Sequence, residues 1–497
     1  MKIIQITLIW LLFISSLNNS SAKQPAITIN GTLKGTSILK NSSLTINLYA
    51  DYIPSALAEF KNSQNCLIDS LGKFSITLNP SAELVYISFS LQIPGQQPVN
   101  DLTSSFLVKP FLFSAGDVVN MDLNMKSAKI HFSGKGAAKL NCQALISSVS
   151  LPAGITDRVM QLHNQSAHIP AYQLLHESLE NLLVLKAGIL NSYKDSLAAD
   201  QYQLIETDMA AEQRFKYLKS LSISYTVSTK VKKNAISTFF NDYLLKSTQL
   251  PITSDETLLK SAFALNLAYQ MEWLTLNFKY EGQKITLQQI FDHIVTKYKS
   301  PIRDRLLLIC LLTLAKKEPA EVFKYAAIAL KTMDHSKEKD LLINWTTKHT
   351  AGSKVYNFTL LDENGKTVRL TDFKDSILLI DFWFLGCKGC TQMPKALEGI
   401  MERYKHKKDV KFISLNVDRS RSSWMKGLES GLYHSKGQIN LNTGTMGTDH
   451  PLIRYYNYNS YPQLLIIGRN QELISSNPID PRIDQGAEIK SLIDKAI

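Results

Sequence analysis

Two cysteines separated by two residues, Cys387 and Cys390, are the side chains whose types and spacing indicate chemistry most directly. They belong to the stretch DFWFLGCKGC, which follows a short apolar run and leads into the helical pattern TQMPKALEGIMERY. Cysteines at this spacing can bind a metal, form a permanent disulfide, or open and close as a redox pair. The function of the chain depends on which of these three uses applies.

Redox exchange explains the pair best. A zinc site usually needs four ligands, and the nearest other cysteine, Cys310, lies 77 residues before Cys387. Covalent haem attachment requires a histidine directly after the second cysteine, where this chain has Thr391. A permanent disulfide across so short a loop would remove little entropy from the unfolded chain. We therefore expect a redox-active disulfide, with no metal and no further cofactor.

The place of the pair, after a predicted strand and before a predicted helix, favours a reactive thiol. The first turn of a helix has unpaired N–H groups and the positive end of the helix dipole, and both stabilise a thiolate. We expect Cys387 to be the exposed attacking thiol and Cys390 the buried resolving thiol. Lys388 adds a positive charge beside the thiolate, and Gly389 stands where many such motifs have proline, which should loosen the turn.

The residues around the pair predict an α/β domain. A hairpin with a turn at Asn364-Gly365 precedes a buried strand at 376–384. The helix after the cysteines leads to a strand at 409–418, and a second hairpin at 462–478 is followed by a closing helix. Strand, helix and strand followed by a hairpin and a helix predict a mixed sheet. The cysteine pair would lie where the buried strand ends.

Two further regions precede this domain. Residues 23–133 consist of short alternating or β-branched runs divided by turn signals, which predicts an all-β, sandwich-like, antiparallel domain. Residues 134–350 carry apolar residues at helical spacing, and Cys310 is expected in the core of one of these helices. With the α/β domain at 351–497, the predicted fold class is multidomain.

The chain begins with the layout of a secretory signal peptide at 1–22. A lysine precedes an apolar run from Ile3 to Ile14, and small residues stand at Ser20 and Ala22. The run is too short to span a membrane, and no later stretch is long and apolar enough, so the mature chain is expected in the periplasm or cell envelope without a membrane span. The formal charge of +12 over 497 residues accompanies no nucleic-acid-binding motif, which argues against nucleic acid as a partner.

Residues 355–497 resemble the thioredoxin fold, and within it the exported TlpA/ResA-type thiol–disulfide oxidoreductases. The resemblance is carried by FTLLDENGKTVRLTDFKDSILLIDFWF, GCKGC, VKFISLNVD and YYNYNSYPQLLII. It implies that Pro462, preceded by Tyr461, is a cis-proline that faces the disulfide and shapes the groove for the partner's chain. It also implies that Asp381 accepts the proton of Cys390.

Alternation along the predicted strand supports a role for Asp381. It places this carboxyl on the same face as Leu379 and Trp383, inside the domain. Burial there should raise the pKa of Asp381 toward neutrality, where a carboxylate can accept a proton from a thiol.

The resemblance has departures at the partner-binding surface, which we expect to include Gly386, Lys388, Tyr461 and Pro462. Gly386 replaces the tryptophan that usually precedes the first cysteine, so the surface has one aromatic side chain fewer. A peroxiredoxin-like peroxidase, the minor alternative, would need a threonine where Phe384 stands.

The sequence therefore predicts an exported thiol–disulfide oxidoreductase that exchanges disulfides with envelope proteins. The resemblance implies protein disulfides and dithiols as substrates and a membrane-borne electron donor, and the direction of exchange stays open. The competing hypothesis is a partner- or surface-binding envelope protein, in which the thioredoxin-like domain is a redox sensor or a structural module. The observation that favours this hypothesis is the long part of the chain that lies outside the redox domain.

Overall fold

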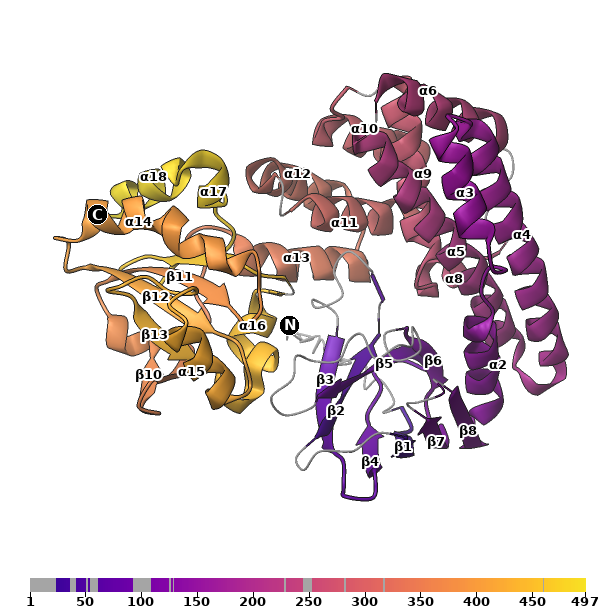
Figure 1. Ribbon diagram of the computed structural model, residues 1–497, viewed down its shortest axis with the longest axis horizontal. Helices are drawn as coiled ribbons and strands as arrows, with labels where there is room; N and C mark the ends of the chain where they lie inside the picture. Colours follow the sequence, from indigo (N-terminus) through magenta and orange to yellow (C-terminus); the bar gives the residue numbers. More distant parts are fainter. Residues whose placement is uncertain are drawn as a thin grey trace, which may run out of the picture.

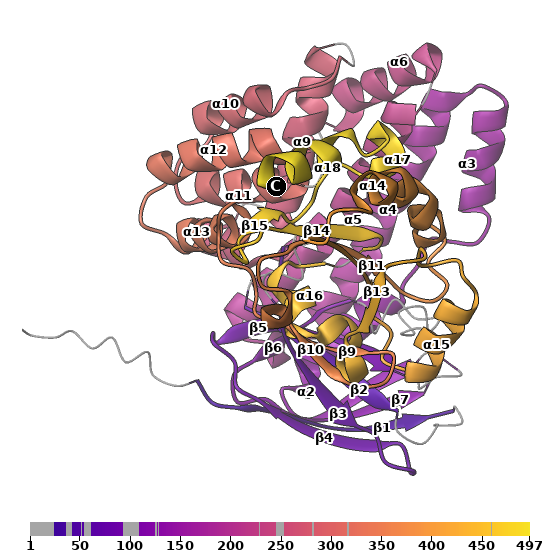
Figure 2. The same cartoon turned by 90° about the vertical axis from the view of Figure 1, so that its left-hand side faces the viewer.

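The computed structural model describes residues 24–35, 42–50, 52–53, 61–92, 109–124, 127, 129–227, 229–244, 253–280, 283–315, 318–458 and 460–497. The predicted signal peptide at 1–22 lies outside the described residues. A β region, a helical region and an α/β region follow one another along the chain, as predicted (Figure 1). Figure 2 views the molecule with the α/β region toward the reader. Within the described ranges, none of the helices is both long and apolar enough to cross a membrane.

Two four-stranded sheets form the β region. In sheet order, one holds β4 (Lys73–Leu78), β1 (Ile27–Lys34), β7 (Val118–Asn124) and β8 (Lys129–Lys135), and the other holds β3 (Lys61–Leu67), β2 (Ser43–Tyr49), β5 (Leu84–Gln92) and β6 (Phe111–Ser114). Buried residues of both sheets, such as Ile29 and Ile46, share one core, which confirms the sandwich-like prediction. The β1–β7 pair is parallel, so the expectation of a purely antiparallel arrangement is wrong there.

Burial explains which strands the sequence pattern revealed. The side chains of β1 and β7 alternate between buried and more exposed positions, as their apolar alternation predicts. The structure adds two strands that the sequence pattern does not indicate, β3 and β8, with residues KNSQNCL and KIHFSGK. Both are edge strands, which contribute fewer side chains to the core and therefore lack a strong apolar period.

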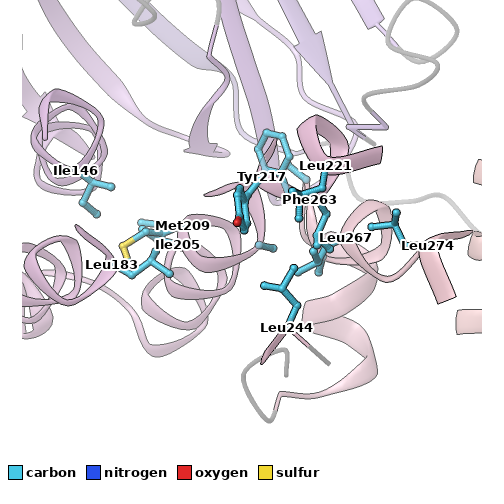
Figure 3. Packing of buried hydrophobic residues seen from close by; sticks show 14 of the residues in the cluster. Ile146, Leu183, Ile205, Met209, Tyr217, Leu221, Leu244, Phe263, Leu267 and Leu274 are labelled. Atoms are coloured by element: carbon cyan, nitrogen blue, oxygen red, sulfur yellow. The ribbon is translucent and has the colours of Figure 1, made fainter. Parts of the chain in front are cut away.

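The helical region stacks helices around two apolar clusters. Its α-helices are α2 (Ala137–Ser148), α3 (Ile155–Asn164), α4 (His168–Ser192), α5 (Ala199–Val227), α6 (Lys230–Phe239), α8 (Asp255–Lys260), α9 (Ala264–Lys279), α10 (Leu287–Lys297), α11 (Ile302–Leu314), α12 (Pro319–Thr332) and α13 (Lys337–His349). In the first cluster, Leu183 of α4 packs with Ile205 and Met209 of α5 (Figure 3). Cys310 of α11 is completely buried in the second cluster, as predicted.

Asp208 of α5 connects the helical region with the β region. Its carboxyl accepts hydrogen bonds from the Tyr86 hydroxyl of β5, from Ser261 Oγ at 2.6 Å and from the Ala262 backbone N–H at 2.8 Å. Burial raises the pKa of Asp208 to about 7, although these hydrogen bonds act in the opposite direction. The folded chain therefore favours the protonated carboxyl.

Replacing Asp208 with asparagine should make folding stability less dependent on pH. Because the pKa of Asp208 is raised in the folded chain, the free energy of unfolding of the wild type is greater at low pH than at high pH. This extra stability is about 4 kcal/mol; it is fully present below about pH 4 and is lost by about pH 7. An amide does not ionise, so Asp208→Asn avoids this loss. Thermal unfolding midpoints at several pH values check the prediction. The wild-type midpoint should fall relative to the variant as the pH rises, and parallel curves would contradict it.

The α/β region contains a seven-stranded mixed sheet. Its strands, in sheet order, are β10 (Thr367–Arg369), β9 (Thr359–Asp362), β13 (Ile439–Asn442), β12 (Val410–Asn416), β11 (Ile377–Trp383), β14 (Gln463–Ile467) and β15 (Leu473–Ser475). Its α-helices are α14 (Met393–Tyr404), α15 (Arg421–Glu429), α16 (Pro451–Tyr455), α17 (Pro481–Asp484) and α18 (Ala487–Ala496). The central strand β11 pairs parallel with β12 and antiparallel with β14.

Both predicted hairpins of this region are present, β9–β10 and β14–β15. All seven residues of β11 are buried, and they alternate between two cores on opposite faces of the sheet. The helices α14 and α18 contribute to one of these cores, together with Leu379. The structure also adds β13 and α16, which have four and five residues and which the sequence pattern does not indicate. Elements this short carry too few apolar positions to show a period.

Candidate active site

The cysteine pair lies directly after the central strand of the α/β sheet. Cys387 and Cys390 form a disulfide with their Cα atoms 5.3 Å apart. The Cys390 backbone N–H donates hydrogen bonds to the Cys387 carbonyl oxygen and to Cys387 Sγ, each at 3.1 Å. A donor at this distance would also stabilise a thiolate on Cys387 in the reduced protein.

The helix start differs from the expectation. A single 3₁₀ turn, Cys390–Gln392, precedes α14, which begins at Met393. The cysteines are therefore in a tight turn before the α-helix, not in its first turn. Pro394 occupies the first turn of α14, where a proline ring costs no helical hydrogen bond.

The burial of the two cysteines corrects one prediction. Cys390 is fully buried, as expected, but Cys387 is only 5% exposed, so it is not the freely exposed thiol that the sequence predicted. Both cysteines pack in an aromatic cluster with Trp383, Trp424 and Tyr433. The ring of Trp383 stacks on that of Tyr433 with centroids 4.7 Å apart. No local sequence pattern indicates this cover, because Trp424 comes from α15 and Tyr433 from the loop after it.

The proline predicted to face the pair is close to it. The Tyr461–Pro462 peptide bond is cis. A Cβ atom built on Gly389 would lie 3.3 Å from Pro462 Cδ, which places the proline ring against Gly389, the residue directly before Cys390. Tyr461 is half-buried and meets the Phe384 ring edge-on at 5.7 Å.

Gly386 and Lys388 flank Cys387 at the surface. Gly386 is exposed and has a φ of 92°, a conformation that L side chains rarely adopt, and its N–H donates to the Tyr433 hydroxyl at 2.9 Å. The backbone here therefore favours glycine at position 386. Lys388 is exposed, and its carbonyl oxygen accepts a hydrogen bond from Thr391 Oγ1 at 2.9 Å.

Asp381 is buried in β11, as its position in the alternating pattern predicts. Asp381 is 1% exposed, and its Oδ1 has no hydrogen-bond partner among the described residues. Burial raises the pKa of Asp381 well above its usual value, while the positive charge of Arg482 lowers it and Asp480 raises it. A carboxyl in this state holds a proton at pH values where an ordinary carboxyl is ionised.

The structure adds two polar side chains that the sequence analysis did not identify. Asp418 lies just after β12, which ends at Asn416. It accepts hydrogen bonds from the Leu385 N–H and from Asn416 Nδ2, both at 2.8 Å. Burial raises the pKa of Asp418. Arg482 of α17 donates a hydrogen bond to the Gly389 carbonyl oxygen at 2.9 Å. Asp418 closes the stretch VKFISLNVD, but the resemblance assigns it no role, and Arg482 belongs to none of the quoted motifs.

Comparisons with known proteins agree with this geometry. A thioredoxin-like family model matches residues 375–473. The ResA thiol–disulfide oxidoreductase of Bacillus subtilis (strain 168) is 35% identical over 72 residues, which is 14% of this chain and 38% of the relative. The ResA protein of Bacillus thuringiensis subsp. konkukian is 32% identical over 73 residues, 15% of this chain and 42% of the relative. The chain thus spans less than half the length of these curated relatives.

Solved structures with matching regions include thioredoxin-like proteins of Bacteroides. The thioredoxin domain of a thiol–disulfide oxidoreductase from Bacteroides vulgatus is 20% identical and covers 29% of this chain and 96% of its own, with a TM-score of 0.25. A thiol:disulfide interchange protein from Bacteroides sp. is 21% identical and covers 30% of this chain and 90% of its own, with a TM-score of 0.25. On the family model and the ResA relatives, this multidomain chain carries a C-terminal thioredoxin-like domain similar to ResA-type thiol–disulfide oxidoreductases.

Proposed function

We propose that this protein is an exported thiol–disulfide oxidoreductase that exchanges disulfides with envelope proteins through Cys387 and Cys390. The observation that carries the proposal is the disulfide of this pair, with Pro462 packed beside Gly389 of the same turn, within a thioredoxin-like domain. The signal-peptide pattern at 1–22 supports export.

The exchange has two steps, each of which forms one S–S bond and breaks another. In the reduced protein, the Cys387 thiolate attacks a disulfide of the partner, forms a mixed disulfide and releases one partner thiolate. The Cys390 thiolate then attacks Cys387 Sγ, releases the second partner thiolate and closes the Cys387–Cys390 disulfide. Two electrons pass to the partner, and the reverse sequence oxidises a dithiol.

The neighbouring residues have separate roles in this proposal. The Cys390 N–H, 3.1 Å from Cys387 Sγ, stabilises the attacking thiolate. Asp381 accepts the proton of Cys390 before the second step and returns it in the reverse direction. Tyr461 and Pro462 shape the groove that receives the partner's extended chain, and Gly386 and Lys388 contribute to the same partner-binding surface. Because Cys387 is 5% exposed, the partner must bring its sulfur into this groove.

The partners follow from the resemblance to ResA-type proteins. Protein disulfides and dithiols in the envelope are the proposed substrates. A membrane-borne electron carrier is the proposed donor that returns the pair to the reduced state.

Reduction of insulin by dithiothreitol tests the proposed activity. Insulin supplies protein disulfides, and dithiothreitol regenerates the reduced pair. The wild-type protein should accelerate insulin reduction, and Cys387→Ser should leave the uncatalysed rate. Equal rates for the wild type and Cys387→Ser would overturn the proposed activity and leave the domain as a sensor or a structural module.

A further inference from the structure

Arg482 of α17 contacts the backbone between the two cysteines. Its Nη1 donates a hydrogen bond to the Gly389 carbonyl oxygen at 2.9 Å and lies 3.4 Å from Gln392 Oε1. A Cβ atom built on Gly389 would lie 3.6 Å from the same Nη1 and 3.3 Å from Pro462 Cδ. Arg482 and the cis-proline therefore pack against Gly389 together.

Asp480 holds the Arg482 side chain in this position. Arg482 Nε lies 2.9 Å and 3.0 Å from the two carboxylate oxygens of Asp480, and its Nη2 pairs with Oδ2. The two side chains are 29% and 27% exposed, so water screens their charges only in part. A planar guanidinium held by both oxygens of a carboxylate has a fixed orientation, and here that orientation directs Nη1 at Gly389.

Arg482 also acts on the buried carboxyl of the site. Its positive charge lowers the pKa of Asp381 against the larger effect of burial. Asp381 is 1% exposed, and its Oδ1 has no hydrogen-bond partner in the part of the chain that the structure describes. One side chain thus touches the backbone between the cysteines and influences the proposed proton acceptor.

We propose that Arg482 is a positioning residue for the exchange: it fixes the Gly389 carbonyl group and places a permanent positive charge beside the cysteine pair. This inference rests on the proposed function. Two-electron reduction breaks the Cys387–Cys390 bond and gives two thiols, one of which ionises readily to a thiolate. A nearby positive charge stabilises the thiolate and hence the reduced protein. Removing the charge should make the disulfide harder to reduce.

Equilibration with glutathione buffers, using the full chain, measures this effect. Arg482→Gln keeps a hydrogen-bond donor and removes the charge, so its equilibrium should move about tenfold toward the disulfide, which corresponds to a midpoint about 30 mV lower. Arg482→Lys keeps the charge and should restore most of the wild-type equilibrium. Asp480→Asn removes a negative charge, while its amide oxygen still accepts a hydrogen bond from Arg482, and should move the equilibrium in the opposite direction.

The matched control is Arg403→Gln. Arg403, near the C-terminal end of α14, pairs with Asp494 at 2.8 Å and does not belong to the site, so its loss should leave the equilibrium unchanged. A wild-type equilibrium in Arg482→Gln, or an equal shift in Arg403→Gln, would overturn the role of Arg482 while leaving the proposed function intact. A wild-type protein that fails to exchange with glutathione would instead contradict the proposed function. If Arg482→Gln does not fold, an unchanged equilibrium in Asp480→Asn overturns the inference.

Discussion

Replacing Cys390 with serine should make the protein accumulate covalently bound partners, and replacing Cys387 should abolish both trapping and exchange. Without the Cys390 thiol, nothing in the site attacks the mixed disulfide on Cys387, so the intermediate persists. Without Cys387, the remaining Cys390 is fully buried and cannot reach a partner disulfide. Non-reducing gels of envelope extracts, followed by mass spectrometry, show the trapped species.

Cys66→Ser is the control for the trapping experiment. Cys66 is a free cysteine on β3 and is more accessible than Cys142 or Cys310, the other free cysteines of the chain. Its loss should change neither trapping nor exchange. Equal trapping by the Cys387 and Cys390 variants, or trapping that depends on Cys66, would contradict the assignment of Cys387 as the attacking thiol.

Replacing Asp381 with asparagine should slow release of the mixed disulfide by about 100-fold, the lower end of the range for general acid–base catalysis. The buried carboxyl has a raised pKa and keeps its proton to a higher pH than an ordinary carboxyl, so wild-type exchange rates should show its ionisation as an additional step in the pH profile. The amide keeps the shape and cannot titrate. Stopped-flow exchange rates from about pH 5 to pH 9 test the prediction.

A change in stability separates this role from a structural one. The raised pKa of Asp381 means that ionisation costs stability at high pH, so Asp381→Asn should unfold at a higher temperature than the wild type there. Asp418→Asn is the matched control, since its half-buried carboxyl also has a raised pKa but accepts hydrogen bonds from Leu385 and Asn416. The ionisation should persist in that variant. Superimposable pH profiles for the wild type and Asp381→Asn would make Asp381 a structural residue.

The sequence predicted the parts of the fold that bury a periodic apolar face. The central strand β11, the hairpins around it and the helices around Cys310 all show such a period, and all are present. The edge strands β3 and β8 and the short strand β13 have little apolar surface to bury, so their positions depend on pairing with distant strands. Pairing of this kind leaves no local pattern in the chain.

The candidate site also has features that the sequence predicts and features that it does not. The spacing of Cys387 and Cys390, the buried Asp381 and the cis-proline Pro462 follow from the motif and the resemblance. The aromatic cover over Cys387 does not, because its residues approach from α15 and the loop after it. Arg482 reaches Gly389 across 93 residues of sequence, and only the packing of α17 beside α14 makes that contact.

The midpoint reduction potential of the Cys387–Cys390 disulfide tests the central claim most directly. The full-length protein is equilibrated in glutathione buffers, the free thiols are alkylated, and the oxidised fraction is measured by mass. A pair that exchanges disulfides with partners should have a midpoint between about −120 and −270 mV, the span of known exchange proteins. A midpoint below about −300 mV would show a structural disulfide and contradict the proposed function.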